Sequence, residues 1–180
     1  RARRDEVDGE RAGRLLVRQF LDTRRSHIAV IVDCDRTVYA ADGDFELAVS
    51  AGASVAVRAV RDQMDLSVAA GRFAVVDPDP PMALDVFSRA ELDGVTLSDS
   101  ARELAKLSPD ISVVVMATGS LSGLTGIRHA ASFFPPQVNV VALQAEEGAP
   151  AGMASVGSIT ILTLGRLSEL PIILRGGQPR

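Results

Sequence analysis

Residues 27–33 read HIAVIVD, an apolar run rich in β-branched residues that ends in a carboxylate. A continuous run of this kind, without period-2 alternation, is typical of a parallel strand that is buried on both faces. Similar runs recur at 111–117, 138–143 and 159–164. We therefore expect these segments to be parallel neighbours in one sheet that helices cover on both sides.

The segments between these runs have helical patterns. The clearest is 44–62, where polar residues form a narrow stripe on an otherwise small and apolar helix. Residues 64–70 and 72–77 instead predict an antiparallel hairpin that turns at Gly71. Strands alternating with helices predict an α/β three-layer sandwich with a mostly parallel sheet. The other expected helices are 81–92, 98–107 with Ser98 as its cap, 123–134 and 166–174.

Composition limits the class of protein. The chain has 180 residues, of which 47% are hydrophobic and 23% charged, so one folded domain is expected and wholesale disorder is excluded. The net charge of −4 argues against a nucleic-acid partner. A single cysteine favours a reducing compartment, and no apolar run is long enough to insert into a membrane. We therefore expect a cytoplasmic location.

The two ends of the chain differ from its middle. Residues 1–12 are charged and lack apolar periodicity, which predicts a linker or disordered end. Residues 14–21 (RLLVRQFL) fit either an edge strand or a short helix, and 178–180 form a short tail. Because the chain does not begin with Met, we expect it to be a piece of a longer protein.

Polar residues follow the strand expected at 27–33. Asp33, Asp35 and Thr37 lie within a short stretch at its carboxyl end, where open α/β sheets bind their ligands. Two carboxylates and a hydroxyl could hold Mg²⁺, which prefers hard oxygen ligands. Alternatively, Asp33 accepts hydrogen bonds from loop amides while Asp35 and Thr37 form a solvated turn. The sequence leaves both interpretations open.

The same Asp-x-Asp-x-Thr pattern resembles the first motif of haloacid-dehalogenase-type phosphatases. That resemblance implies that Asp33 attacks phosphorus and that Asp35 acts as acid and base. Thr118, after the strand expected at 111–117, would supply the second motif. No lysine follows before the next strand, and the only acidic pair for the metal is Glu146-Glu147. A magnesium-dependent phosphohydrolase is therefore the alternative function.

Long stretches of the chain resemble one bacterial family. GRLLVRQFLDTRRSHIAVIVD (13–33), DFELAVSAGASVAVRAVRD (44–62) and LPIILRGG (170–177) closely resemble the Domain of Unknown Function 58 family, particularly its actinobacterial members. The resemblance covers 13–177 and implies a von Willebrand factor A-like domain, with one antiparallel edge strand. It further implies a role beside MoxR-type AAA+ ATPases, with which family members are usually encoded, in assembling or maturing other proteins. Many members carry membrane helices upstream of this domain.

An intact metal-ion-dependent adhesion site in such domains has Asp-x-Ser-x-Ser after the first strand, a Thr from a second loop and an Asp after a later strand. The first element is matched by Asp33, Asp35 and Thr37. The second element is matched by Thr96 or Ser98. The third position reads Thr118-Gly119, which has no acidic residue. The resemblance therefore implies a degenerate site, with no cofactor and at most weak Mg²⁺ binding.

Three polar segments are expected to form the working surface. Residues 34–42, 96–100 and 118–123 follow or approach the carboxyl ends of strands, so they should converge on a rigid sheet. We expect a non-catalytic protein-interaction module that meets its ATPase partner there. The residues expected to contact the partner are Asp35, Arg36, Asp42, Ser98, Asp99, Thr118 and Ser120.

Overall fold

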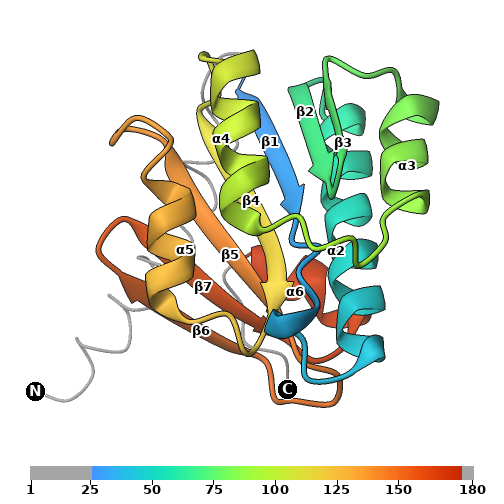
Figure 1. Ribbon diagram of the computed structural model, residues 1–180, viewed down its shortest axis with the longest axis vertical. Coiled ribbons are helices and arrows are strands. Elements are labelled where there is room, and N and C mark those ends of the chain that lie inside the picture. Colours follow the sequence, from blue (N-terminus) through green and yellow to red (C-terminus); the bar gives the residue numbers. More distant parts are fainter. Residues whose placement is uncertain (1–25, 176–180) are drawn as a thin grey trace, which may run out of the picture.

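The computed structural model describes residues 26–175, which form a seven-stranded sheet between two layers of helices (Figure 1). The strand order is β3-β2-β1-β4-β5-β7-β6. The strands are β1 (His27–Val32), β2 (Asp65–Ala70), β3 (Phe73–Val76), β4 (Val113–Gly119), β5 (Asn139–Ala145), β6 (Gly152–Val156) and β7 (Ile159–Leu164).

The parallel centre of the sheet is the one that the sequence predicts. Strands β1, β4, β5 and β7 are parallel neighbours, and β2 adds a further parallel strand beside β1. Every residue of β1 is buried, because strands flank it on both sides and helices cover both of its faces. This two-sided burial explains why β1 is apolar from residue 28 to residue 32.

Antiparallel strands lie at both edges of the sheet. The predicted hairpin is confirmed: β3 pairs antiparallel with β2, and Gly71 at the turn has a φ of +57°. The expectation of a single antiparallel edge strand is wrong, because β6 pairs antiparallel with β7 at the other edge. The middle of β6, from Met153 to Ser155, is exposed. An exposed edge strand requires no apolar run, so the pattern that indicates the central strands is missing there.

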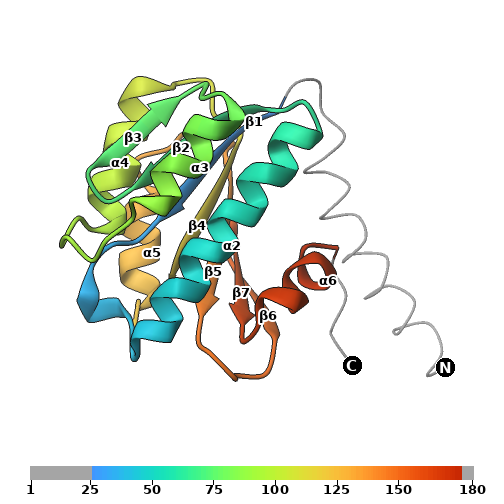
Figure 2. The same ribbon diagram turned by 90° about the vertical axis from the view of Figure 1, so that its right-hand side faces the viewer.

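The helices form two layers around two apolar cores. The helices α2, α3 and α6 pack on one face of the sheet, and α4 and α5 pack on the other (Figure 2). Among residues 26–175, no helix combines the length and the apolar character that crossing a membrane requires. The helices are α2 (Asp42–Arg61), α3 (Pro80–Ser88), α4 (Leu97–Leu107), α5 (Leu124–Ala131) and α6 (Leu170–Leu174), with 3₁₀ turns η1 (Arg36–Val38) and η2 (Leu167–Glu169).

Several helix ends differ from the expected ones. The helix α4 begins after Thr96, not at Ser98, because Thr96 and Asp99 form a reciprocal capping box. The helix α3 ends at Ser88, four residues before the expected end at 92. The helix expected at 166–174 is divided into η2 and α6.

The order of the strands reverses at β1. The chain leaves β1 through α2 to reach β2 on one side, and it later enters β4 on the other side. In open α/β sheets, the crevice at the carboxyl ends of such strands is where ligands bind. Here that position lies between Asp33, directly after β1, and Thr118-Gly119 at the end of β4.

Candidate functional site

The carboxylate of Asp33 joins the ends of β1 and β4. Its side chain is 2% exposed. One carboxylate oxygen, Oδ2, accepts a hydrogen bond of 2.8 Å from the hydroxyl of Thr118, and Oδ1 accepts one of 3.2 Å from the amide of Asp35. The amide of Asp33 also donates to the carbonyl of Ala117 on β4. Asp33 therefore fixes the first loop against β4.

Burial makes the charged form of Asp33 unfavourable. Removal from water raises the pKa of this carboxyl from 3.8 to about 6. The hydrogen bonds from Thr118 and from the amide of Asp35 stabilise the ionised form and lower the pKa, but less than burial raises it. The nearby charge of Asp35 acts in the same direction as burial. The folded protein therefore retains the Asp33 proton to a higher pH than the unfolded chain does.

Asp35 and Thr37 form a local turn. Oδ1 of Asp35 accepts hydrogen bonds from the amide of Thr37 at 2.9 Å and from its hydroxyl at 2.8 Å, which caps η1. This is the geometry of the turn interpretation. Next to it, Arg36 Nη2 lies 3.1 Å from Oδ1 of Asp42, and both side chains are exposed. The first polar segment therefore presents a carboxylate and an exposed ion pair to solvent.

The side chain of Tyr39 holds the loop after β1 in place. Tyr39 was not among the residues that the sequence indicated. Its hydroxyl donates a 2.6 Å hydrogen bond to the carbonyl of Asp33, and its ring meets Phe45 edge-on at 5.4 Å between centroids. The side chain is buried, and burial raises the pKa of its hydroxyl. In the sequence, the one feature that distinguishes this residue is that the chain contains no other tyrosine.

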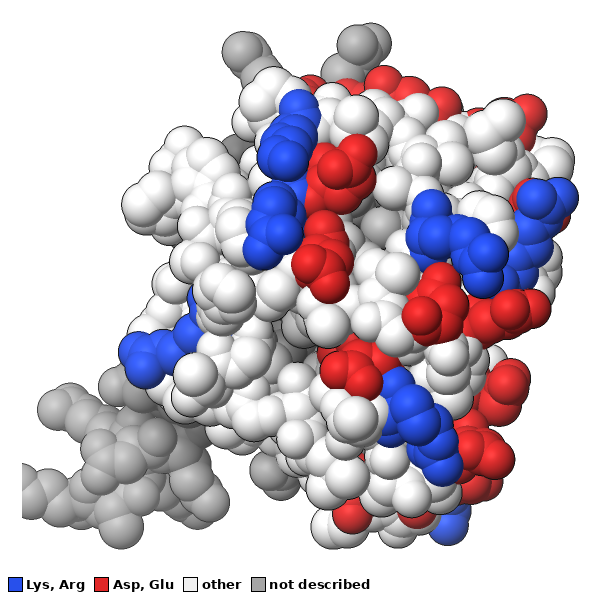
Figure 3. Space-filling model, in the orientation of Figure 1, with Lys and Arg blue, Asp and Glu red and all other residues white. Residues whose placement is uncertain are grey.

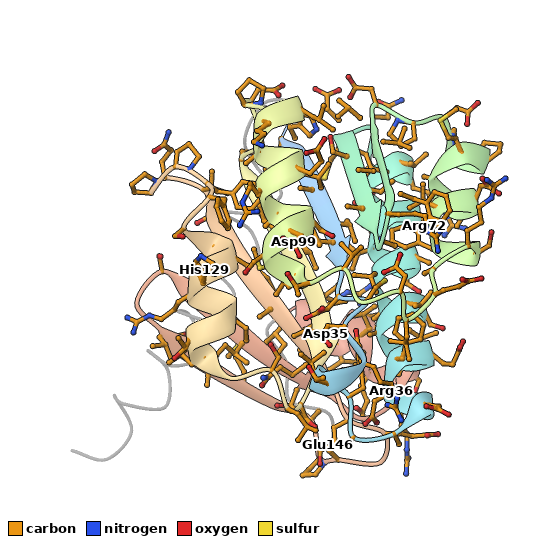
Figure 4. All side chains as sticks on the ribbon, viewed as in Figure 1. Asp35, Arg36, Arg72, Asp99, His129 and Glu146 are labelled. Atoms are coloured by element: carbon orange, nitrogen blue, oxygen red, sulfur yellow. The ribbon has the colours of Figure 1, made fainter. Side chains whose placement is uncertain are left out.

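The structure brings the three polar segments together. The amide of Leu121 donates to the carbonyl of Val38 at 3.0 Å, which joins 118–123 to 34–42. The amide of Cys34 donates to the carbonyl of Val95 at 3.2 Å, directly before 96–100. Asp35 and Arg36 lie at the lower edge of the sheet, and Asp99 lies on α4 (Figure 4). We call residues 34–42, 96–100 and 118–123 the carboxyl-edge surface.

The side chains of Thr96 and Ser98 contact helices instead of Asp33. The hydroxyl of Thr96 donates to Oδ2 of Asp99 at 2.7 Å and accepts from the Asp99 amide. The hydrogen bond from Thr96 lowers the pKa of Asp99. The hydroxyl of Ser98 lies 3.2 Å from Nδ1 of His129 on α5. Thr96 therefore has a structural role at the start of α4, and Ser98 joins α4 to α5.

The residues matched to a metal site are committed to separate partners. Asp33 bonds to Thr118, Asp35 bonds to Thr37, and Thr96 bonds to Asp99. Within residues 26–175, no group of three or more His, Cys, Asp or Glu side chains is arranged to hold a metal ion. A hard cation such as Mg²⁺ requires several oxygen ligands around one point. The arrangement of these side chains does not fit a tight Mg²⁺ site.

We expect the purified protein to bind Mg²⁺ weakly or not at all. Titration calorimetry should give no saturable heat at micromolar metal, because Asp33 is buried and Thr37 and Thr96 are engaged elsewhere. The Asp35→Asn variant serves as the control and should give the same trace. Micromolar affinity that this substitution abolishes would contradict the prediction.

A further buried carboxylate, Asp44, lies beside this surface. Its Oδ1 accepts a 2.7 Å hydrogen bond from the amide of Glu147, and its Oδ2 accepts from the amide of Ala41. Asp44 therefore fixes the loop after β5 against the start of α2. Figure 4 shows Glu146 of that loop at the same edge as Asp35. The sequence analysis did not identify Asp44, although an acidic residue in the first turn of a helix is a capping signal.

Charge on this side of the molecule is mixed. Acidic and basic side chains are interspersed over the face that carries α4 and α5, without a single large region of one sign (Figure 3).

Comparison of the chain with protein-family models, with curated proteins and with solved structures finds no match. What the fold and the site show is an α/β sandwich whose loops at the carboxyl edge of the sheet are held together by a buried carboxylate, Asp33.

Proposed function

We propose that this protein is a non-catalytic interaction module of the von Willebrand A type that binds a MoxR-type AAA+ ATPase through its carboxyl-edge surface. The resemblance at 13–177 suggests the partner. The observation that carries the proposal is the pair of hydrogen bonds at Asp33, which engages both oxygens of this carboxylate in holding the loops together. The position where a catalytic or metal-binding carboxylate is expected thus has a structural role.

The exposed side chains of the carboxyl-edge surface suit a protein partner. Leu121 is 60% exposed, and its amide is fixed to Val38. Arg36 and Asp42 form an exposed ion pair on the neighbouring segment. An apolar side chain among polar and charged ones is the usual composition of a transient protein interface. Because these side chains stand on loops that the sheet holds in place, little ordering is required on binding.

The proposal is tested by capture of the cognate ATPase from solution. The Asp35→Arg/Asp42→Arg variant should lose affinity by about tenfold or more, because it places like charges against a complementary basic partner. The matched control is Asp65→Arg/Glu103→Arg, which makes the same charge change at exposed positions outside the surface. Capture by wild type should also weaken as salt rises. Equal capture by wild type and both variants would place the interface elsewhere.

A separate assay tests the alternative function, a magnesium-dependent phosphohydrolase. Turnover of p-nitrophenyl phosphate with Mg²⁺ should be the same for wild type and Asp33→Asn, at the level of the uncatalysed reaction. Asparagine preserves the size and hydrogen-bonding capacity of the side chain but cannot act as the nucleophile. Clear hydrolysis that disappears in Asp33→Asn would overturn the interaction-module proposal.

A further inference from the structure

The strand β6 leaves one edge of the sheet open. In the described part of the chain it has a hydrogen-bonded neighbour, β7, on one side only, and it lies at the opposite edge of the sheet from β3 (Figure 1). The pairing with β7 covers all five residues of β6 without interruption. Met153, Ala154 and Ser155 are exposed, and half of the surface of Met153 is in contact with solvent.

The turn after β6 determines which of its backbone groups face outward. Residues 157–158 form a two-residue turn, so Val156 and Ile159 on either side of it are a hydrogen-bonded pair. Hydrogen-bonded pairs alternate along an antiparallel ladder, so every second residue back from Val156 bonds to β7. The amides and carbonyls of Met153 and Ser155 therefore point away from β7, toward the open edge.

This edge lacks the features that normally keep strands from pairing with another chain. Natural edge strands are protected by charged side chains, by proline or by a bulge. Residues 148–165 include no charged residue, and 152–156 include no proline. The ladder between β6 and β7 has no bulge. The backbone at this edge is therefore free to accept another strand.

The opposite edge of the same sheet is protected. Arg72 and Asp77 flank β3, and the guanidinium groups of Arg72 and Arg89 lie 6.0 and 5.9 Å from the centre of the Phe73 ring. The helices α3 and α4 also contact β3. The two edges of the sheet therefore differ, and β6 is the one suited to pairing.

We propose that β6 pairs antiparallel with β6 of a second copy of this chain, about a twofold axis at Ala154. The register that overlaps the two strands fully places residue 152 opposite 156 and residue 153 opposite 155. Met153 of each copy then exchanges hydrogen bonds with Ser155 of the other, through the groups that face outward. Ala154 meets its own counterpart at the non-hydrogen-bonded position, where two Cα atoms approach to about 4.5 Å and a small side chain fits.

The composition of β6 suits a second copy as the occupant. Twofold pairing brings side chains of β6 opposite side chains of the same strand, so any charge in it would face a like charge. The strand carries none. Pairing also covers part of the exposed surface of Met153, which is favourable for an apolar side chain.

Twofold pairing produces a dimer and not a fibre. Each copy uses its one open edge, and the protected edge at β3 offers no further site. Because the interface is confined to one short strand from each copy, the dimer should be weak. This inference does not rest on the proposed function, since β6 lies outside the carboxyl-edge surface.

Sedimentation equilibrium tests the association. The full chain is used, because the segments 1–12, 14–21 and 178–180 lie outside the described residues and an occupant of the edge from within the chain would leave the protein monomeric. The mean mass of wild type should rise from that of the monomer toward twice that value between about 10 μM and 1 mM protein. A monomer at every concentration would overturn the proposal.

Charge substitutions at Ala154 test the position of the axis. Ala154→Lys and Ala154→Glu should each weaken association about tenfold or more, because each places two like charges directly opposite one another. Both variants should have the circular dichroism of wild type, since the position is exposed. An equimolar mixture of the two should associate again, because Lys then faces Glu. Association that neither substitution changes, or a loss that the mixture does not restore, would contradict the twofold pairing.

Disulfide formation measures the same contact without added charge. Ala154→Cys should link two copies, because the non-hydrogen-bonded pair brings two Cα atoms within the range that a disulfide spans. The matched control is Ser158→Cys, which is exposed in the turn of the same hairpin but away from the axis. The native thiol does not interfere, because Cys34 is fully buried and burial raises its pKa to about 12. Ala154→Cys should form linked dimers about tenfold faster than the control, and equal rates would overturn the proposal.

Discussion

Asp33→Asn is expected to stabilise the protein near neutral pH and to remove a pH dependence between about pH 4 and pH 6. The pKa of Asp33 is about 6 in the folded protein, against 3.8 for an ordinary Asp. Between these values the folded state holds a proton that the unfolded chain has released, so stability falls as the pH rises through this window. The full difference corresponds to roughly 3 kcal/mol of unfolding free energy.

Asparagine removes this cost without removing the hydrogen bonds. Its carbonyl oxygen can accept from the amide of Asp35, and its amide can donate to the hydroxyl of Thr118. Urea unfolding of wild type and variant over a range of pH measures the difference directly. Asp33→Ala is the contrasting variant. It leaves the Thr118 hydroxyl and the Asp35 amide without this partner, and below about pH 4, where the ionisation of Asp33 costs nothing, it should destabilise by about 2–4 kcal/mol. Parallel pH curves for wild type and Asp33→Asn would contradict the raised pKa of Asp33 in the folded protein.

Gly119→Ala is expected to destabilise the protein by about 1–3 kcal/mol or more. A Cβ on Gly119 would collide with the carbonyl oxygen of Val38 and would lie 2.7 Å from the ring of Tyr39. The loop cannot easily move away, because the amide of Leu121 is bonded to that same carbonyl and Tyr39 is buried. The close approach of β4 to 34–42 therefore requires glycine at this position.

The matched control for Gly119→Ala is Gly126→Ala in α5. A Cβ there has only one neighbour, the Ser122 hydroxyl at 3.9 Å, and the position is helical. Alanine should therefore stabilise by about 0.5–1 kcal/mol. Thermal unfolding measures both variants. A Gly119→Ala protein as stable as wild type would show that the loop is not held against β4.

The sheet could be predicted from the sequence where burial is two-sided. The stretches 28–32 and 113–117 are apolar at every position because both faces of the sheet are covered, and this pattern predicts buried parallel strands. The edge strand β6 has no such constraint, and its exposed Met153, Ala154 and Ser155 leave no pattern. The sequence marks its end only by Gly157, which in the structure turns the chain from β6 into β7 with a φ of +63°.

The site could be predicted in outline but not in its contacts. Asp33 and Thr118 were both placed at the carboxyl edge from their positions after strands, and the structure joins them. Which oxygen accepts from which donor depends on the distance between β1 and β4, which no spacing along the chain reports. Tyr39 and Asp44 were missed because each acts through a partner that is a loop backbone group. Thr96 could have been identified as the cap, since Asp99 follows it by three residues.

Hydrogen exchange of the protein, alone and with the cognate ATPase, tests the interaction surface most directly. The amides of 34–42, 96–100 and 118–123 should exchange more slowly in the complex, because these segments converge at the end of β1 and β4 and carry the exposed Arg36, Asp42 and Leu121. Protection confined to the outer helices α3 and α5, or no protection anywhere in the chain, would contradict the proposal that this edge binds the ATPase.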